Sequence, residues 1–169
     1  TCNYILTKME EDEENFDEVL RIASEKGYAE ASPSLDIDGY DTAHKAAILA
    51  SLAYGEWFGM DSVYIEGISK ISLKDIKFAA ELGYKTKLLA IMKKNNDNVE
   101  IRVHPALIPE ETMLAGISNV NNGVYVKGEP IGTTLFYGQG AGKEATSSAV
   151  IADIMDVALN LKFGAHQRV

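Results

Sequence analysis

Residues 27–55 read GYAEASPSLDIDGYDTAHKAAILASLAYG, and this stretch decides the fold of the chain. It begins with an acidic loop and continues into an apolar helix whose first turns carry Asp41 and Lys45. Residues four apart on a helix share a face, so the Asp41 carboxylate and the Lys45 ammonium should meet. The following AAILASLA has almost no polar face, which predicts a buried helix. The carboxylates of the preceding loop are Glu30, Asp36 and Asp38.

Spacing alone leaves two interpretations of the Asp41–Lys45 pair. A charged pair at the mouth of a buried helix is expensive, because burying charge costs roughly several kcal/mol per ion unless partners compensate. Function is one reason for a protein to tolerate that cost. The structural alternative is a solvated ion pair whose acidic member interacts favourably with the helix macrodipole. Spacing by itself favours the structural alternative.

Composition narrows the classes of protein to which the chain can belong. Its 169 residues are 46% hydrophobic and 24% charged, which is ordinary for a globular domain with a real core. The net charge of −9 disfavours nucleic acid and acidic membrane surfaces as partners. Cys2 has no second cysteine to pair with, which fits a reducing cytoplasm. No apolar run approaches the roughly 20 residues that span a bilayer, so we expect a cytoplasmic protein.

Hydrophobic periodicity and turn residues predict the remaining elements. Ser72 is a good N-cap, Asn95 to Asn98 have hairpin chemistry, and Pro109 suits the first position of a helix. Trp57 and Phe58 are expected to cap the core. Helices are predicted over 3–9, 16–26, 72–82, 109–117 and from the glycine-rich turn to about 161. Strands are predicted over 63–68, 85–93, 99–107, 124–127 and 133–137.

A glycine-rich turn, GQGAG at 138–142, precedes the last predicted helix. Such a turn between strand and helix presents backbone N–H groups that bind phosphate. Its spacing is not GxGxxG, because Lys143 stands where a glycine is needed, and no βαβ unit surrounds it. A complete dinucleotide site is therefore not expected, and a tight structural turn is the simpler explanation.

A long motif at fixed spacing runs through the central stretch: Gly27, Tyr28, Ala29, Glu30, Pro33, Asp36, Gly39, Asp41, Ala43 and Lys45. This motif closely resembles the signature of homoserine dehydrogenases, which reads GY-x-E-x-DP, an Asp, and then G-x-D-x-x-x-K. The chain departs from it at Ser32, where the family often has Asp before the proline. The missing carboxylate is not at a position to which we assign chemistry.

Two further segments are similar to the same family. TCNY at 1–4 fits the latter part of a GT-x-NYIL segment, and GAGKEATSSAV at 140–150 resembles GAG-x-x-PT-x-SAV, with Ala145 replacing the usual proline. The resemblance extends from Tyr4 to Ile154. The family's dinucleotide fingerprint and a second catalytic lysine lie upstream, in a half that this chain lacks.

The resemblance implies a fold and an assembly. Residues 1–169 would form a single catalytic and dimerisation domain of the α+β class, in which helices cover one face of a mixed, largely antiparallel sheet. A second subunit would seal the other face and make a homodimer. The run LLAIM at 88–92 adds a weak cue, since apolar residues on both faces of a strand indicate that both are covered.

The resemblance also implies a reaction, the NAD- or NADP-dependent interconversion of L-aspartate 4-semialdehyde and L-homoserine in threonine and methionine biosynthesis. Lys45 would be the proton donor, and Asp41 would orient it. The substrate's ammonium group would bind Glu30 and Asp36. Tyr28 would line the same pocket, although a core aromatic is an equal alternative. The turn formed by Gly140, Ala141 and Gly142 would face the nicotinamide.

The cofactor would be held mainly by the upstream domain, so we expect the isolated chain to be inactive. No protein metal site is expected, because the three histidines are scattered along the chain. The main alternative function is a non-catalytic amino-acid-binding or regulatory domain that keeps the fold. A dehydrogenase acting on a different semialdehyde is a further alternative.

Overall fold

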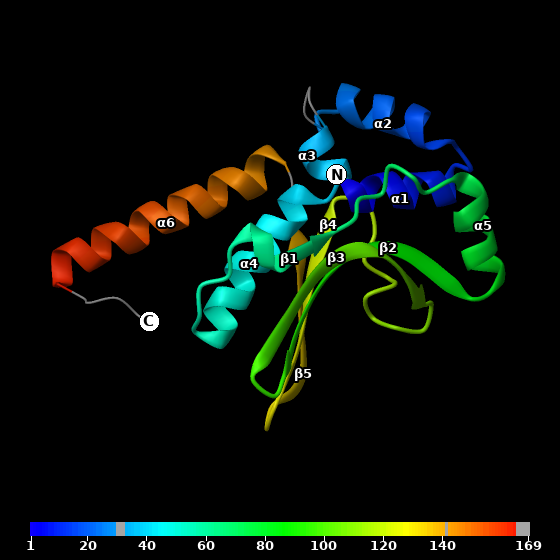
Figure 1. The fold of residues 1–169 in the computed structure, drawn as a ribbon. Coiled ribbons are helices and arrows are strands. Elements are labelled where there is room, and N and C mark those ends of the chain that lie inside the picture. Colours follow the sequence, from blue (N-terminus) through cyan, green and yellow to red (C-terminus); the bar gives the residue numbers. More distant parts are fainter. Residues whose placement is uncertain (30–32, 141, 165–169) are drawn as a thin grey trace.

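The chain combines a helical layer, a three-stranded sheet and a separate β-hairpin (Figure 1). A computed structural model describes residues 1–29, 33–140 and 142–164. The elements are α1 (Cys2–Glu11), α2 (Phe16–Glu25), α3 (Ser34–Ile37), α4 (Tyr40–Tyr54), the 3-10 helix η1 (Met60–Ser62), β1 (Val63–Ile65), α5 (Leu73–Glu81), β2 (Tyr84–Asn95), β3 (Asn98–Pro109), β4 (Asn121–Gly128), β5 (Gly132–Gln139) and α6 (Lys143–Phe163).

The larger sheet has the strand order β1-β3-β2. Strand β1 runs parallel to β3, with Val63 opposite Ile101. Strands β2 and β3 form a long antiparallel hairpin that closes where Asn95 faces Asn98. Strands β4 and β5 form a second antiparallel pair of their own. The mixed, largely antiparallel class is confirmed, and the strands are divided between two sheets.

Helix α4 packs on one face of the larger sheet through its alanines. Ala43, Ala46 and Ala50 are fully buried and contact the side chains of Ile101 and Val103 on β3. Small side chains allow a helix to approach a sheet closely, which explains this alanine-rich face. The face of α4 that points away from the sheet was also expected to be buried, and that expectation is wrong for this chain. It exposes Ile48, Leu49 and Leu52.

A second core forms where α1, α2 and α5 meet. Ile5 and Met9 of α1 are fully buried among Val19 of α2 and Ile76 of α5. Helix α5 begins with the predicted cap: the Ser72 hydroxyl accepts from the Asp75 amide, and the Asp75 carboxylate accepts from the Ser72 amide. Such a capping box satisfies two amides that would otherwise lack partners.

Two local predictions are wrong. Residues 110–116 form turns instead of a helix, and Pro109 ends strand β3. The strand tolerates Pro105 and Pro109 because β1 pairs only with residues 101–103, which leaves the rest of that side of β3 unpaired. Trp57 does not cap the core, since 86% of it is exposed. Phe58 does pack, edge-on against the ring of Tyr54.

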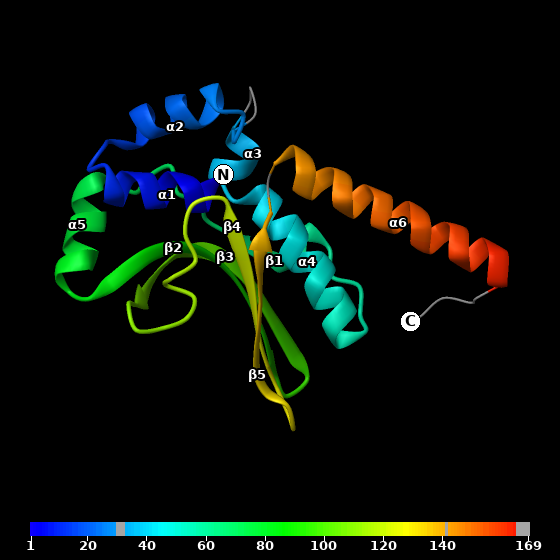
Figure 2. The same ribbon diagram turned by 180° about the vertical axis from the view of Figure 1, so that it is seen from behind.

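The two hairpins extend in the same direction from the helical layer, and α6 projects away from the rest of the chain (Figures 1 and 2). No residue of α6 is buried, although the helix is rich in Val, Ile, Leu and Met. The hairpin β4–β5 likewise exposes Tyr125, Val126, Phe136 and Tyr137. None of the helices that the structure describes is both long enough and apolar enough to cross a membrane.

Candidate active site

The predicted ion pair forms on the first turns of α4. The Lys45 Nζ atom lies 2.5 Å from Asp41 Oδ2, one helical turn away. Both side chains are solvated in this chain, with 69% of the Lys45 side chain and 45% of the Asp41 side chain exposed. The pair is therefore present where the spacing predicted it, but the described residues do not bury it. An exposed pair of this kind contributes only about 0.3–0.5 kcal/mol to stability.

Two glycines shape the turn that delivers Asp41 to its position. Gly39 precedes α4 with φ of +87°, a left-handed conformation that glycine adopts without strain. Gly67 follows β1, and its backbone lies directly against that turn. A Cβ at position 67 would overlap with the Ile37 carbonyl oxygen and the Asp38 Cα. The amide of Ile68 donates to the Ile37 carbonyl at 2.7 Å, so β1 and the α3–α4 turn are joined through their backbones.

Asp36 lies on the short helix α3 and is held by the first turn of α1. The Thr1 hydroxyl lies 2.6 Å from Asp36 Oδ2 and 2.7 Å from the Tyr28 carbonyl oxygen. The Cys2 thiol donates to the Asp36 carbonyl at 3.0 Å. Asp36 is thus positioned through its side chain and its backbone by residues far away in sequence.

The Cys2 thiol shows that Asp36 and Asp41 share one neighbourhood. The pKa of Cys2 is raised to about 12, mainly by burial, and the negative charges of Asp36 and Asp41 contribute to this rise. Both carboxylates are therefore close enough to act on the same buried sulfur. A thiol in this environment stays protonated and is a packing group instead of a nucleophile.

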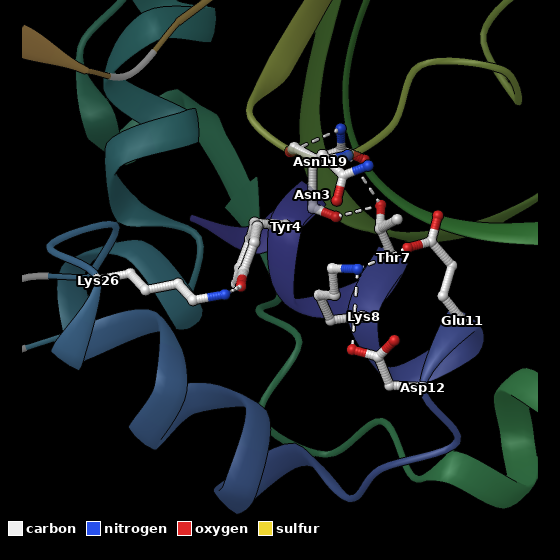
Figure 3. Close-up of polar contacts among 8 residues, drawn as sticks. All are labelled: Asn3, Tyr4, Thr7, Lys8, Glu11, Asp12, Lys26 and Asn119. Carbon is white, nitrogen blue, oxygen red and sulfur yellow. Dashed lines mark hydrogen bonds and ion pairs between the residues drawn. The ribbon is translucent and has the colours of Figure 1, made fainter.

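Tyr28 packs as a core aromatic, one of the two roles considered for it from the sequence. Its ring packs against Tyr4 with the centroids 4.9 Å apart, beside the core of α1 and α2. The Tyr4 hydroxyl accepts from Lys26 Nζ at 3.2 Å (Figure 3). Tyr28 remains partly exposed next to Asp36, and its carbonyl is one of the acceptors near Thr1.

Two of the predicted site residues, Glu30 and Ala141, lie outside the described residues. Gly140 ends the β4–β5 hairpin, and its amide donates to the Val120 carbonyl at 3.3 Å. A Cβ there would overlap with the side-chain nitrogen of Asn122. Gly142 has φ of +118° at the start of α6, again a conformation that requires glycine. Gly140 and Gly142 therefore each have a structural reason to be glycine.

The structure adds residues to the site that the sequence did not single out for a role. Thr1 at the N-cap of α1, and Cys2 and Tyr4 within it, contact Asp36 or Tyr28. In the sequence, TCNY at 1–4 is similar to a segment of the family. That similarity indicates that these residues matter, but it does not predict which residues they contact. Across residues 1–29, 33–140 and 142–164, no three His, Cys, Asp or Glu side chains lie close enough to hold a metal ion.

Comparisons with known proteins match nearly the whole chain. The family model described as homoserine dehydrogenase matches residues 1–155. The homoserine dehydrogenase of Neisseria gonorrhoeae is 48% identical over 94% of this chain and 36% of its own length. That of Helicobacter pylori is 49% identical over 94% of this chain and 38% of its own length. The chain thus spans little more than a third of the curated relatives it matches.

Solved structures show the same similarity in three dimensions. A homoserine dehydrogenase from Thiobacillus denitrificans superposes with a TM-score of 0.92 at 45% identity, covering 99% of this chain and 39% of the other. A hyperthermophilic archaeal homoserine dehydrogenase in complex with NADPH superposes with a TM-score of 0.75 at 28% identity, covering 94% and 44%. On the extent of these matches, the chain belongs to the homoserine dehydrogenase family.

Proposed function

We propose that this chain is the substrate-binding and catalytic region of a homoserine dehydrogenase that interconverts L-aspartate 4-semialdehyde and L-homoserine with NAD or NADP. It would serve threonine and methionine biosynthesis in the cytoplasm. The observation that carries the proposal is the Asp41–Lys45 pair on the first turns of α4, with Asp36 on the adjoining helix α3, in a member of this family. An amino-acid substrate with a reacting oxygen needs carboxylates that bind its ammonium group and a proton-transfer group such as lysine.

Lys45 is assigned the proton transfer at the substrate oxygen. Its ammonium carries three N–H donors, so it is able to donate to Asp41 and to a developing alkoxide at the same time. Asp41 holds the ammonium in place through the 2.5 Å contact. In this proposal the remaining part of the longer protein covers the exposed face of α4 and excludes water from the pair.

Asp36 is assigned the α-ammonium group of the substrate, together with Glu30. Of the two carboxylate oxygens of Asp36, Oδ2 lies beside the Thr1 hydroxyl, which leaves Oδ1 for a cationic ligand. Tyr28 contributes its partly exposed edge to the same pocket. A carboxylate held by a hydroxyl and by packed backbone has little freedom to move, which favours tight and oriented binding.

The glycine turn suits the approach of a flat cofactor ring. Gly140 and Gly142 have no side chains, and Ala141 between them in the sequence has only a methyl group. These residues would contact the nicotinamide cofactor, which when bound would accept a hydride from homoserine in its oxidised form or supply one to the semialdehyde in its reduced form. The archaeal relative was solved with NADPH, which supports a nicotinamide cofactor for the family. The upstream domain is assigned most of the cofactor contacts.

A homodimer is the proposed assembly. The β4–β5 hairpin exposes Tyr125, Val126, Phe136 and Tyr137 from its two strands. A two-stranded hairpin with an uncovered apolar surface is only marginally stable in water, so a covering partner is favoured. A second copy of the same chain would supply a matching surface through two-fold symmetry. Light scattering of the full-length protein tests this assembly.

The decisive experiment uses the full-length protein that contains this chain. Homoserine-dependent formation of NADH or NADPH would be followed for the wild type and for Lys45→Ala. We expect the variant to lose about two to four orders of magnitude in kcat, the usual range for a proton-transfer group, with homoserine binding largely kept. The isolated 169-residue chain serves as a further arm and should show no turnover.

The other outcomes are equally informative. Activity that survives Lys45→Ala nearly intact would return Asp41–Lys45 to an ordinary ion pair and move the chemistry elsewhere. A wild-type protein that binds homoserine without oxidising it would favour the non-catalytic amino-acid-binding domain. Faster oxidation of a different hydroxy amino acid would indicate another semialdehyde as the natural substrate.

A further inference from the structure

The first turn of α1 has contacts on two sides. On one side, Thr1 and Cys2 bind Asp36, and Tyr4 packs against the ring of Tyr28. These three contacts hold both described residues of the proposed ammonium site. The position of Asp36 therefore depends on where the first turn of α1 lies.

On the other side, Asn3 ties the same turn to the base of the β4–β5 hairpin. Its Nδ2 donates to the Asn121 carbonyl at 2.9 Å and lies 3.3 Å from the Asn119 carbonyl oxygen. Thr7, one helical turn later, accepts from the Asn119 amide at 3.2 Å (Figure 3). The Asn3 Oδ1 atom accepts from Lys87 Nζ at 3.1 Å.

Lys87 on β2 is buried to an unusual degree for a lysine, with 8% of the residue exposed. Its Nζ also donates to the Ile117 carbonyl at 2.6 Å. No carboxylate among the residues that the structure describes lies within 4.0 Å of this ammonium. Burial accordingly lowers the pKa of Lys87, against the attraction of the more distant Glu10 and Glu11.

An ammonium that is buried among neutral acceptors is costly, because it has lost water without gaining a counter-ion. An apolar residue would fill the same space without this desolvation cost. What Lys87 contributes is therefore its directional hydrogen bonds to Asn3 and to the Ile117 carbonyl. Those bonds fix the first turn of α1 relative to β2 and to the loop before β4. Neighbouring Lys85 differs, since it is more exposed and pairs with Glu10 and Glu110.

We propose that Lys87 is a positioning residue for the substrate site: its ammonium holds Asn3, and through the first turn of α1 it sets the position of Asp36. The inference rests on the proposed function, because it takes Asp36 as a ligand of the substrate's ammonium group. Lys87 acts at the amino-acid end of the site. The proton-transfer pair lies on α4, and no hydrogen bond among the described residues joins it to this network.

The test measures steady-state kinetics of the full-length protein with varied L-homoserine and a saturating nicotinamide cofactor. Lys87→Met keeps the length and burial of the side chain while removing both hydrogen bonds. We expect the KM for homoserine to rise about tenfold or more, since small displacements of a binding group have large effects. The kcat should stay within about threefold of the wild type, because Lys45 is undisturbed. Lys85→Met is the matched control and should leave both constants unchanged.

A double-mutant cycle distinguishes positioning from general destabilisation. Thr1→Val removes the hydroxyl beside Asp36 and should also raise the KM. If Lys87 acts through the first turn of α1, the combined variant will be less impaired than the product of the two single effects. Independent, multiplicative effects would overturn the proposal, as would a homoserine KM within twofold of the wild type in Lys87→Met.

A second pair of variants covers the case in which Lys87→Met does not fold. Asn3→Asp and Asn3→Leu both lose the Nδ2 donor, but only the Asp variant keeps an acceptor for Lys87. The KM should rise in Asn3→Leu and stay near the wild-type value in Asn3→Asp; an equal rise in both would overturn the proposal. A wild-type protein that does not oxidise homoserine overturns the proposed function and this inference together. An active wild type with unaffected variants overturns the inference alone.

Discussion

The amide of Ile68 donates to the carbonyl of Ile37 at 2.7 Å, which joins the end of β1 to the turn between α3 and α4. This backbone bond is possible because Gly67 has no side chain to separate the two segments. Asp36 lies on α3 just before this turn, and Asp41 and Lys45 lie on α4 just after it. The proposed catalytic groups are thus located relative to the sheet by a contact between backbones.

Gly67→Ala should therefore disturb stability and activity together. The added methyl group would overlap with the Ile37 carbonyl oxygen and the Asp38 Cα, so the backbone has to move. We expect a loss of about 1–3 kcal/mol in the free energy of unfolding, the usual effect of overpacking. Urea titration and homoserine oxidation by the full-length protein measure the two effects.

Gly59→Ala is the control for this substitution. Gly59 has no atom within 4 Å of an added Cβ, and its φ of −79° suits any residue. Its free energy of unfolding should change by less than about 0.5 kcal/mol. Equal destabilisation by both substitutions would show that the close approach at Gly67 is not the cause.

Asp41→Asn should separate function from stability. The Asp41–Lys45 pair is exposed, so its loss should change the free energy of unfolding by at most about 0.5 kcal/mol. The kcat of the full-length protein should nevertheless fall by about tenfold or more, because the ammonium loses the partner that orients it. Glu25→Gln on α2 breaks a similarly exposed pair with Arg21 and should leave kcat unchanged. A wild-type kcat for Asp41→Asn would contradict the assigned role.

Cys2 should make stability depend on pH in the alkaline range. Its thiol pKa rises from 9.0 to about 12 on folding, mainly through burial. Between these values the unfolded chain releases the proton and the folded chain keeps it. The contribution is therefore complete below pH 9 and is lost as the pH rises toward 12, by up to about 1.4 kcal/mol per pH unit.

The measurement is urea unfolding of the wild type and Cys2→Ala at several pH values from 7.5 to above 9. Other groups titrate in both proteins, so the difference between the two proteins isolates the thiol. The stability of the wild type should fall more steeply above pH 9 than that of Cys2→Ala. Parallel curves would show that the folded thiol has an ordinary pKa.

The uncovered apolar side chains of α6 should make the isolated chain associate with itself. Ile154 and Leu161 are 62% and 82% exposed, and neither contacts a core. Replacing both with lysine should reduce association, seen as a lower scattering mass, without lowering the Tm. A marked fall in Tm would show instead that α6 packs against the rest of the chain.

Much of the local structure was predictable from the sequence. Helix periodicity, the Ser72 cap and the Asn96 turn depend on neighbours within a few residues, so α2, α5 and the β2–β3 hairpin are found where they were predicted. The Asp41–Lys45 contact belongs to the same class, because helix geometry alone brings residues four apart together. The assignment of the reaction came from family resemblance, which local physics would not have produced.

What the sequence by itself determined is most of the helices and strands and the ion pair on α4, since these follow from short-range geometry. Only the tertiary structure decided that Pro109 ends a strand, that Trp57 stays in solvent, and that Thr1 and Cys2 hold Asp36. Those outcomes depend on long-range pairing: a proline is accepted where β1 no longer pairs with β3, and Asp36 is bound by residues more than thirty positions away. Contacts across such separations are set by how whole elements pack, and no periodicity in the chain encodes them.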